Sequence, residues 1–393
     1  MKEGIDMKIH WATRLRGFLR HVSQRLTTVE FSEDNNYYET NTFVDKLKSK
    51  CIHFRIFDLL GFFQVIQIKN VDCNIYGSFN RFLSADKPYF IYLENPTALY
   101  HYSLDRIKYR LGKKRFKACL EDRNLRYIIC MSKACANTFE KINMAVPDHV
   151  KLIIIYPLVP TNMWVNEQQI HQKCQNETLE CLFCVQGIRF ASKGGIETMR
   201  AVNRLYDAGV KIHLTVITKI SDVNEEILEE IKSYPFITLY DFTFPYSELE
   251  QIYANTNILI QATSDESFGL TILEAMKGGC ALIGSQMYAI PEMIRDGYNG
   301  YLLEPHYWFF DENNIPNPMV WNHRKKTIYS GKISESLVAA ISEKLNLLSD
   351  RKKLETFCLN SYRMSMCEEF SEEGIVKKWN DVLNDFSNHA INS

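Results

Sequence analysis

Apolar residues in this 393-residue chain gather in short runs, separated by longer stretches in which they recur every three or four positions. The short runs fit buried strands of a parallel sheet, and the stretches between them fit helices that pack on it. The pattern predicts strands at 51–57, 64–69, 73–76, 88–93, 127–131 and 151–156, and then at 182–185, 212–217, 237–240, 258–262, 281–284 and 301–303. We therefore predict an α/β protein with two doubly wound parallel sheets.

The two groups of strands define the predicted domains. Residues 1–157 form a first Rossmann-like domain, in which 1–50 are not assigned, and the polar stretch 158–178 is its linker to the second. Residues 179–351 form the second Rossmann-like domain. Residues 352–393 are helical in pattern and are predicted to cross back to the first domain.

The most informative polar segment follows the predicted strand 258–262. A helix is predicted to begin near Gly269. Two carboxylates flank its N-terminus: Glu266 lies in the loop before it, and Glu274 lies just over one turn into the helix. The unpaired amides and the positive dipole of a helix N-terminus stabilise an anion such as a phosphate. A nucleotide-sugar would place its diphosphate there and its sugar and ribose hydroxyls near the two carboxylates. Taken singly, each glutamate is more often an ordinary helix-start or solvated residue.

A second segment follows the apolar run 180–185. Gly187 allows a tight turn, and Arg189 and Lys193 can direct two cations at a diphosphate before the next helix begins at the Gly-Gly pair 194–195. Such cations stabilise the negative charge that builds on a leaving diphosphate. A Lys-Gly-Gly sequence alone is commonly a surface turn.

These segments together resemble the family 4 glycosyltransferases of the GT-B fold. The resemblance is carried by Glu266 to Glu274, by the Pro-Glu pair 291–292, by the Asp-Gly-Tyr-Asn-Gly run 296–300 and by the Gly-Arg-Lys segment. It implies two Rossmann-like domains that face each other across a cleft, and a retaining, metal-independent transfer from a nucleotide-sugar. The catalytic residues it implies are Arg189, Lys193 and Glu266; the donor-binding residues are Gly187, Ser267, Phe268, Gly269, Leu270, Thr271 and Glu274.

The function implied by the resemblance is transfer of a sugar, from a UDP-sugar, to a glycan or lipid-linked glycan in surface polysaccharide, lipopolysaccharide or capsule biosynthesis. The alternatives are a nucleotide-sugar hydrolase or epimerase on the same fold, or a non-catalytic sugar-nucleotide-binding subunit. No cofactor and no metal are expected, since the chain has no Asp-x-Asp motif. Glu94 and Asn95, after the strand 88–93, are candidates for the acceptor side; the alternative is that they cap the loop.

Charge is unevenly distributed along the chain. The first 150 residues contain 24 basic and 16 acidic residues (+8), and the remainder 22 and 31 (−9). An apolar stripe at helical spacing over 8–26 and the basic run 106–117 suit docking on an anionic membrane, although either stretch also fits an amphipathic helix packed on its own domain. No nucleic-acid module accompanies this charge.

Two further features bear on location and architecture. Eleven cysteines in apolar segments, with no secretory segment at the start, favour a cytoplasmic protein, compatible with the inner face of the membrane. Residues 306–332, rich in aromatic residues and Asn, resemble an insertion and are expected to be a decorated loop or a lid.

Overall fold

The computed structural model describes residues 7–33, 54–142, 145–243, 245–367 and 369–391. The chain divides into two compact units. Unit 1 comprises residues 1–158, 313–315 and 372–393; unit 2 comprises residues 159–312 and 316–371. The C-terminal helix thus belongs to unit 1, whereas residues 159–178, in the range predicted as a linker, belong to unit 2 and include helix α6 (Glu167–Cys174).

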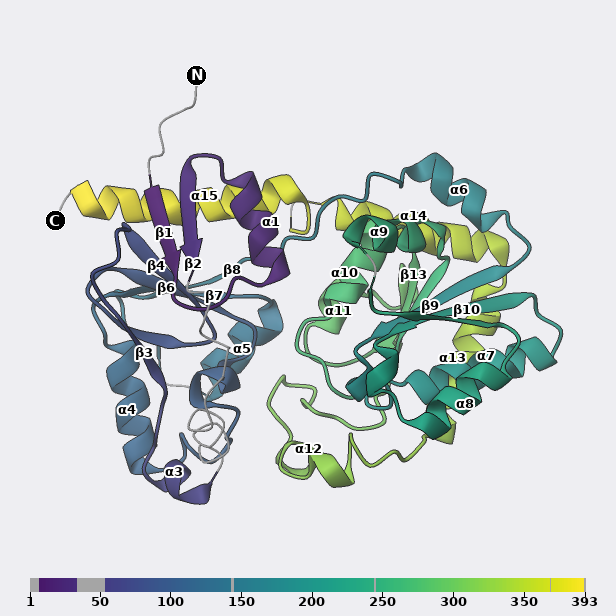
Figure 1. Ribbon diagram of the computed structural model, residues 1–393, viewed down its shortest axis with the longest axis horizontal. Coiled ribbons are helices and arrows are strands. Elements are labelled where there is room, and N and C mark those ends of the chain that lie inside the picture. Colours follow the sequence, from purple (N-terminus) through teal and green to yellow (C-terminus); the bar gives the residue numbers. More distant parts are fainter. Residues whose placement is uncertain (1–6, 34–53, 143–144, 244, 368, 392–393) are drawn as a thin grey trace. The chain divides into compact units, whose positions relative to one another are not determined.

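Unit 1 is built on a six-stranded parallel sheet of order β2-β1-β4-β6-β7-β8 (Figure 1). Its strands are β1 (Met7–Trp11), β2 (Val29–Glu33), β4 (Ile75–Phe79), β6 (Tyr89–Leu93), β7 (Leu125–Cys130) and β8 (Lys151–Ile154). Strands β3 (Val65–Ile68) and β5 (Phe82–Ala85) form a separate parallel pair. The central strands β4 and β6 are buried along their whole length, as expected where helices cover both faces.

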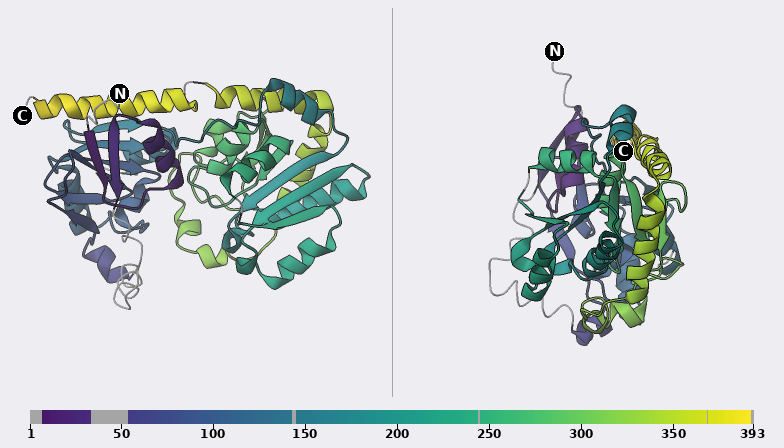
Figure 2. Two further views of the ribbon diagram at one scale, coloured as in Figure 1. Left: turned by 45° about the horizontal axis from the view of Figure 1, so that its top comes forward. Right: turned by 90° about the vertical axis from the view of Figure 1, so that its right-hand side faces the viewer.

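Aromatic side chains fill one face of this sheet. Helix α15 (Glu372–Ile391) lies along it in Figure 2, and its Trp379 ring contacts Phe90 and Tyr92 with centroids 5.6 Å away in each case. Helix α1 (Gly17–Arg25) packs Phe18 against Phe79 and Tyr92. Helices α4 (Arg110–Leu120) and α5 (Lys133–Ile142) contribute Phe116 and Phe139 to a separate buried cluster of unit 1, which also contains Ile91 of β6.

The N-terminal prediction was partly wrong. Residues 8–26 are not one amphipathic helix, because strand β1 precedes α1. The apolar stripe is buried inside unit 1 and so cannot enter a membrane; its members are Trp11, Leu15, Phe18, Leu19, Val22 and Leu26. The strand predicted at 51–57 is also wrong over its described part, where the short helix α3 spans Arg55–Leu59; residues 51–53 lie outside the described residues.

Unit 2 repeats the architecture with a parallel sheet of order β11-β10-β9-β12-β13-β14. All six strands predicted for this part of the chain are confirmed, and the predicted class of two parallel-sheet α/β domains is confirmed with them. The strands are β9 (Leu179–Val185), β10 (Ile212–Thr218), β11 (Ile237–Asp241), β12 (Ile258–Gln261), β13 (Ala281–Ser285) and β14 (Gly300–Leu303).

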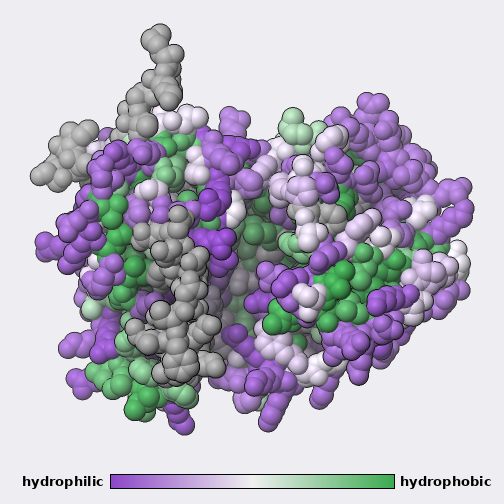
Figure 3. Space-filling view, viewed as in Figure 1, coloured by the Kyte–Doolittle hydropathy of each residue, from purple (hydrophilic) through white to green (hydrophobic). Residues whose placement is uncertain are grey.

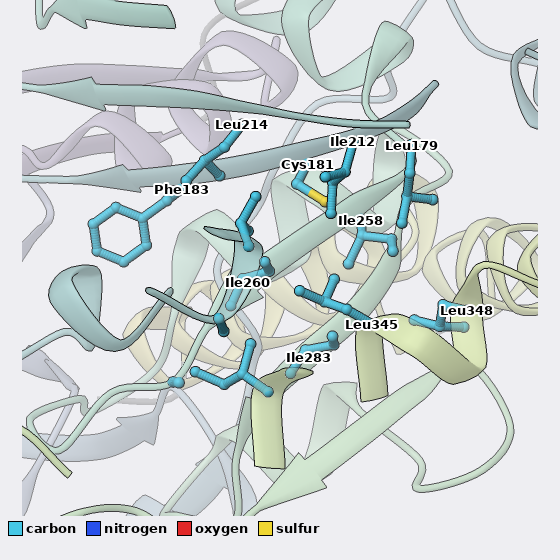
Figure 4. Close-up of a cluster of buried hydrophobic side chains, with 14 of the residues drawn as sticks. Leu179, Cys181, Phe183, Ile212, Leu214, Ile258, Ile260, Ile283, Leu345 and Leu348 are labelled. Carbon is cyan, nitrogen blue, oxygen red and sulfur yellow. The ribbon is translucent and has the colours of Figure 1, made fainter. Parts of the chain in front are cut away.

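Helices cover both faces of this second sheet (Figure 1). They are α7 (Gly195–Asp207), α8 (Glu225–Ser233) and α13 (Glu335–Leu348) on one side, and α9 (Tyr246–Asn255) and α10 (Leu270–Lys277) on the other. Helix α14 (Arg351–Ser365) contacts α10 and α6. Figure 4 shows the strand residues Ile258 and Ile283 beside Leu345 of α13, and all three belong to one buried cluster. This core fixes the strand ends from which the site loops leave.

The segment predicted as an insertion is folded. It carries helix α12 (Pro318–Trp321), and helix α11 (Ile290–Met293) precedes it. Its aromatic side chains pack together: Phe309 stacks on Trp321 at 4.2 Å, and the Arg324 guanidinium lies 4.6 Å from the Trp321 ring centre. Across the described parts of the chain, no helix combines the length and apolar character needed to cross a bilayer.

Candidate functional site

The first site loop connects β9 to α7. It contains a short 3-10 turn, Gly187–Arg189, and ends at Gly194, which has a φ of +79°. A Cβ at Gly194 would lie 2.3 Å from the Ala262 carbonyl oxygen, and one at Gly187 equally close to the Lys219 carbonyl oxygen. Only glycine permits this approach, so the two residues hold the loop directly against the neighbouring strand ends.

The second site loop connects β12, the parallel neighbour of β9, to α10. Gly269 begins the helix in a left-handed conformation, with a φ of +92°. Within the described parts of the chain, no acceptor lies within hydrogen-bonding distance of the Leu270 and Thr271 amides. The first turn of α10 therefore presents two free donors and the positive end of its dipole.

Two ion pairs join the loops. The Lys193 Nζ donates to the Asp265 carbonyl oxygen and lies 2.8 Å from Glu266 Oε2. The Arg189 Nη1 lies 3.3 Å from Asp265 Oδ2. Lys193 is 5% exposed, whereas the Arg189 side chain is 44% exposed. One cation is thus fixed inside the site and the other stands at its rim.

The two glutamates have opposite electrostatic environments. Burial alone would raise the pKa of Glu266, but the adjacent Lys193 charge and hydrogen bond, with the Ser267 amide, bring it below its ordinary value. Burial raises the pKa of Glu274, the Glu250 charge adds to the increase, and the hydrogen bond from the Tyr253 hydroxyl at 2.9 Å partly opposes it. Glu266 is therefore held as a carboxylate more strongly than Glu274.

The structure brings most of the predicted donor-side residues together in unit 2. Gly187, Arg189 and Lys193 lie on the first loop, Glu266 to Gly269 lie on the second, and Leu270 and Thr271 form the first turn of α10. Both loops leave the carboxyl ends of adjacent parallel strands. Ligands of doubly wound sheets bind at such ends. Glu274 lies about one turn further along α10.

The predicted acceptor-side residues lie in unit 1. Asn95 is buried and caps a 3-10 turn, since its Oδ1 accepts from the Thr97 amide at 2.9 Å. Glu94 accepts a hydrogen bond from the Tyr102 hydroxyl at 3.0 Å. Asn95 therefore caps the loop, as the alternative interpretation of the sequence had it. A role for Asn95 or Glu94 in binding the sugar acceptor stays a prediction.

Several residues of this site were not predicted. Asp265 pairs with Arg189, and it follows β12 just before Glu266, a position that could have indicated it. The Tyr329 hydroxyl lies 3.4 Å from Asp265 Oδ2, and the Tyr307 amide donates to the Ser264 hydroxyl at 3.0 Å. The segment 306–332 therefore buttresses the second loop. No local pattern signals such contacts, because the partners are far apart in sequence.

The described residues contain no candidate metal site: among them, no group of three or more His, Cys, Asp and Glu side chains is arranged to hold a metal ion. Independence from metals and cofactors stays a prediction.

A family model described as "Glycosyl transferases group 1" matches residues 167–308. The match spans both site loops and most of unit 2. Residues 167–308 thus match a family of glycosyltransferases, and this match supports the enzyme class predicted from the sequence.

Among curated relatives, the UDP-N-acetylglucosamine–peptide N-acetylglucosaminyltransferase GtfA subunit of Streptococcus gordonii is 28% identical over 139 residues. These are 35% of this chain and 22% of that subunit, so the chain spans about a fifth of the length of this relative. An uncharacterized 41.2 kDa protein in the cps region of Klebsiella pneumoniae is 25% identical over 205 residues, which are 49% of this chain and 53% of that protein.

Among solved structures, Alr3699/HepE of Anabaena in complex with UDP and glucose superimposes with a TM-score of 0.58 at 14% identity. The alignment covers 96% of this chain and all of that one. At this identity the likeness concerns the fold, and the predicted GT-B fold is confirmed.

Proposed function

We propose that this protein is a retaining glycosyltransferase that moves a sugar from a UDP-sugar to a glycan or lipid-linked glycan, without a metal ion. The observation that carries the proposal is the pairing of Lys193 with Glu266 and of Arg189 with Asp265 beside the open first turn of α10. Cations, free amides and carboxylates on two adjacent loops match the diphosphate and hydroxyls of a nucleotide-sugar.

The diphosphate is held by the two cations and by the Leu270 and Thr271 amides. Lys193 is fixed by Asp265 and Glu266, so it needs little reorganisation when charge develops on the leaving phosphate. Arg189 is more exposed and can turn from Asp265 to the incoming phosphate. Retention then follows from attack on the donor's front face, with the leaving phosphate taking the acceptor proton.

The two carboxylates hold opposite ends of the donor. Glu266, kept ionised by Lys193, accepts hydrogen bonds from the transferred sugar, and Glu274, positioned by Tyr253, accepts them from the ribose. A single hydrogen bond from an uncharged hydroxyl orients Glu274 and leaves its other oxygen for the nucleotide. This assignment explains why the two glutamates lie on opposite sides of the helix start.

Similarity supports the donor and the pathway. The GtfA subunit is named for UDP-N-acetylglucosamine and HepE is solved with UDP, which favours a UDP-sugar here. The relative in a cps region favours surface polysaccharide synthesis, for which the cytoplasmic side of the membrane is the proposed location.

Transfer is tested by incubating the protein with a panel of UDP-sugars, with and without glycan and lipid-linked glycan acceptors. The proposal predicts release of UDP that depends on an acceptor and yields a product with the donor's anomeric configuration. Release at the same rate without acceptor would point to a hydrolase, and an inverted product would contradict retention.

A further inference from the structure

Unit 1 exposes a compact group of large apolar side chains at the short helix α3. Each member is between 41% and 59% exposed, and they are Phe54, Ile56, Leu59, Leu60, Phe62 and, from α4, Leu111. Figure 3 shows apolar atoms gathered at this end of unit 1. Single exposed apolar residues are ordinary, but a contiguous group of this kind marks a contact surface.

The apolar group is held on a rigid support. Asp58 of α3 forms a buried ion pair with Arg106, whose Nη2 lies 2.9 Å from Asp58 Oδ1. Gly61 packs directly on α4, since a Cβ there would lie 2.3 Å from the Gly112 amide nitrogen. The Arg115 guanidinium donates to the Gly61 carbonyl oxygen at 3.3 Å. The apolar side chains are therefore presented to solvent by a packed turn anchored on α4.

Basic side chains flank the apolar group. Those exposed on or near α4 are Lys108, Arg110, Lys113, Lys114, Arg115 and Lys117. In the part of the chain that the structure describes, Arg110, Lys113 and Lys114 have no carboxylate partner. Asp58 is neutralised by Arg106, which also removes Arg106 from the basic surface that the sequence suggested.

We propose that this α3–α4 surface, formed by the apolar group and the basic face of α4, docks unit 1 on an anionic lipid surface. The apolar side chains enter the boundary between headgroups and acyl chains, and the lysines and arginines lie over the anionic headgroups. The exposed cations run along α4, from Lys108 to Lys117, and an exposed apolar turn lies beside them, which complements a continuous anionic layer with an apolar interior. The surface differs from the buried stripe of residues 8–26.

The inference rests on the proposed function in one respect: the use of docking would be to bring unit 1 to a lipid-linked acceptor. Docking itself requires neither donor nor acceptor. A protein that transfers sugar but ignores vesicles would contradict the docking surface alone, and one that binds vesicles without transfer would contradict the proposed function alone.

The test is co-sedimentation with phosphatidylglycerol-containing and pure phosphatidylcholine vesicles. The wild type should bind only the former and be largely released at ~0.5 M salt, where screening is nearly complete. The double variants Ile56→Glu/Leu59→Glu and Lys113→Glu/Lys114→Glu should each lower the partition coefficient at least about tenfold. Thermal unfolding of each variant verifies that it is folded.

Two controls introduce glutamate at exposed positions of unit 2, one in place of an apolar side chain and one in place of a lysine pair. Met163→Glu alters a side chain that is 86% exposed, and Lys325→Glu/Lys326→Glu reverses an adjacent pair of exposed lysines. Both should bind vesicles as the wild type does. No binding of the folded wild type to anionic vesicles, equal binding to neutral ones, or equal losses in test and control variants would overturn the proposal.

Discussion

The two units use charge in different ways. In unit 2, the cations of the site loops are each paired with a carboxylate, and Lys193 is nearly inaccessible. In unit 1, Arg110, Lys113 and Lys114 stand exposed on α4, and no partner is found for them among the described residues. Paired, buried charges fix a geometry, whereas exposed ones set a surface potential. Unit 2 therefore has a site suited to one small anion, whereas unit 1 has a face suited to an extended anionic surface.

The largest effect is expected from the cations of unit 2. Arg189→Ala and Lys193→Ala should each lower kcat/KM by about 10²-fold or more, roughly 3 kcal/mol of lost transition-state stabilisation. Steady-state kinetics with a UDP-sugar measures this. The control is Arg204→Ala on α7, which removes an exposed ion pair with Glu335 of α13 and should remain near wild type. Near-normal turnover by a folded Arg189→Ala/Lys193→Ala protein would remove the diphosphate role.

The next effect concerns the loop that carries these cations. Gly194→Ala should destabilise unit 2 by about 2–4 kcal/mol, because it combines a left-handed φ with a Cβ that would overlap the Ala262 carbonyl oxygen. Gly209→Ala has a φ of +83° but open space around the new methyl group, so it should cost only about 1 kcal/mol. Denaturant unfolding compares them. Equal losses would mean that close packing of this loop has no energetic weight.

Most strands and candidate site residues of unit 2 could be predicted from the sequence. In unit 2, each buried strand is a clear apolar run and each site loop carries its own glycine and charged residues, so strands and candidate residues were found together. Tyr253 and Tyr329 were missed because their contacts with Glu274 and Asp265 depend only on the tertiary fold.

Unit 1 was harder for a physical reason. From Trp11 at the end of β1, through Leu15, to the buried residues of α1, the spacings are mostly three and four, so the end of a strand followed by a helix imitates one amphipathic helix. The strand β1 also contains Lys8, whose ion pair with Asp72 keeps its polar end at the surface. The apolar run at α3 indicated a buried strand, whereas its side chains are exposed, a distinction that only packing decides.

A smaller effect is expected from pH. Because the folded-state pKa of Glu274 is raised, its carboxylate form opposes folding as pH rises through that pKa. Glu274→Gln should thus melt at or above the wild-type temperature at neutral pH, and the difference should vanish below about pH 4, under the ordinary pKa of a glutamate. Thermal unfolding across pH measures it. A variant that is less stable than wild type at neutral pH would contradict this environment for Glu274.

UDP affinity should show the same titration. The ribose needs an ionised acceptor, so binding should weaken as pH falls through the raised pKa of Glu274. Glu266 has a lowered pKa and stays ionised over that range. The acid-side loss of affinity should therefore be larger in the wild type than in Glu274→Gln, which lacks this titrating carboxylate. Identical pH profiles would argue against Glu274 as a ribose ligand.

The most direct test of the account is calorimetric titration of UDP into the wild type, Glu274→Gln and Glu266→Gln at one pH above neutrality. UDP contains the ribose and the diphosphate but no transferred sugar. Glu274→Gln should weaken UDP binding about tenfold, the loss of one hydrogen bond to a charged group, whereas Glu266→Gln should bind UDP nearly as the wild type does and lose transfer. Equal weakening in the two variants, or the reverse order, would contradict the central claim that the two carboxylates hold opposite ends of the donor.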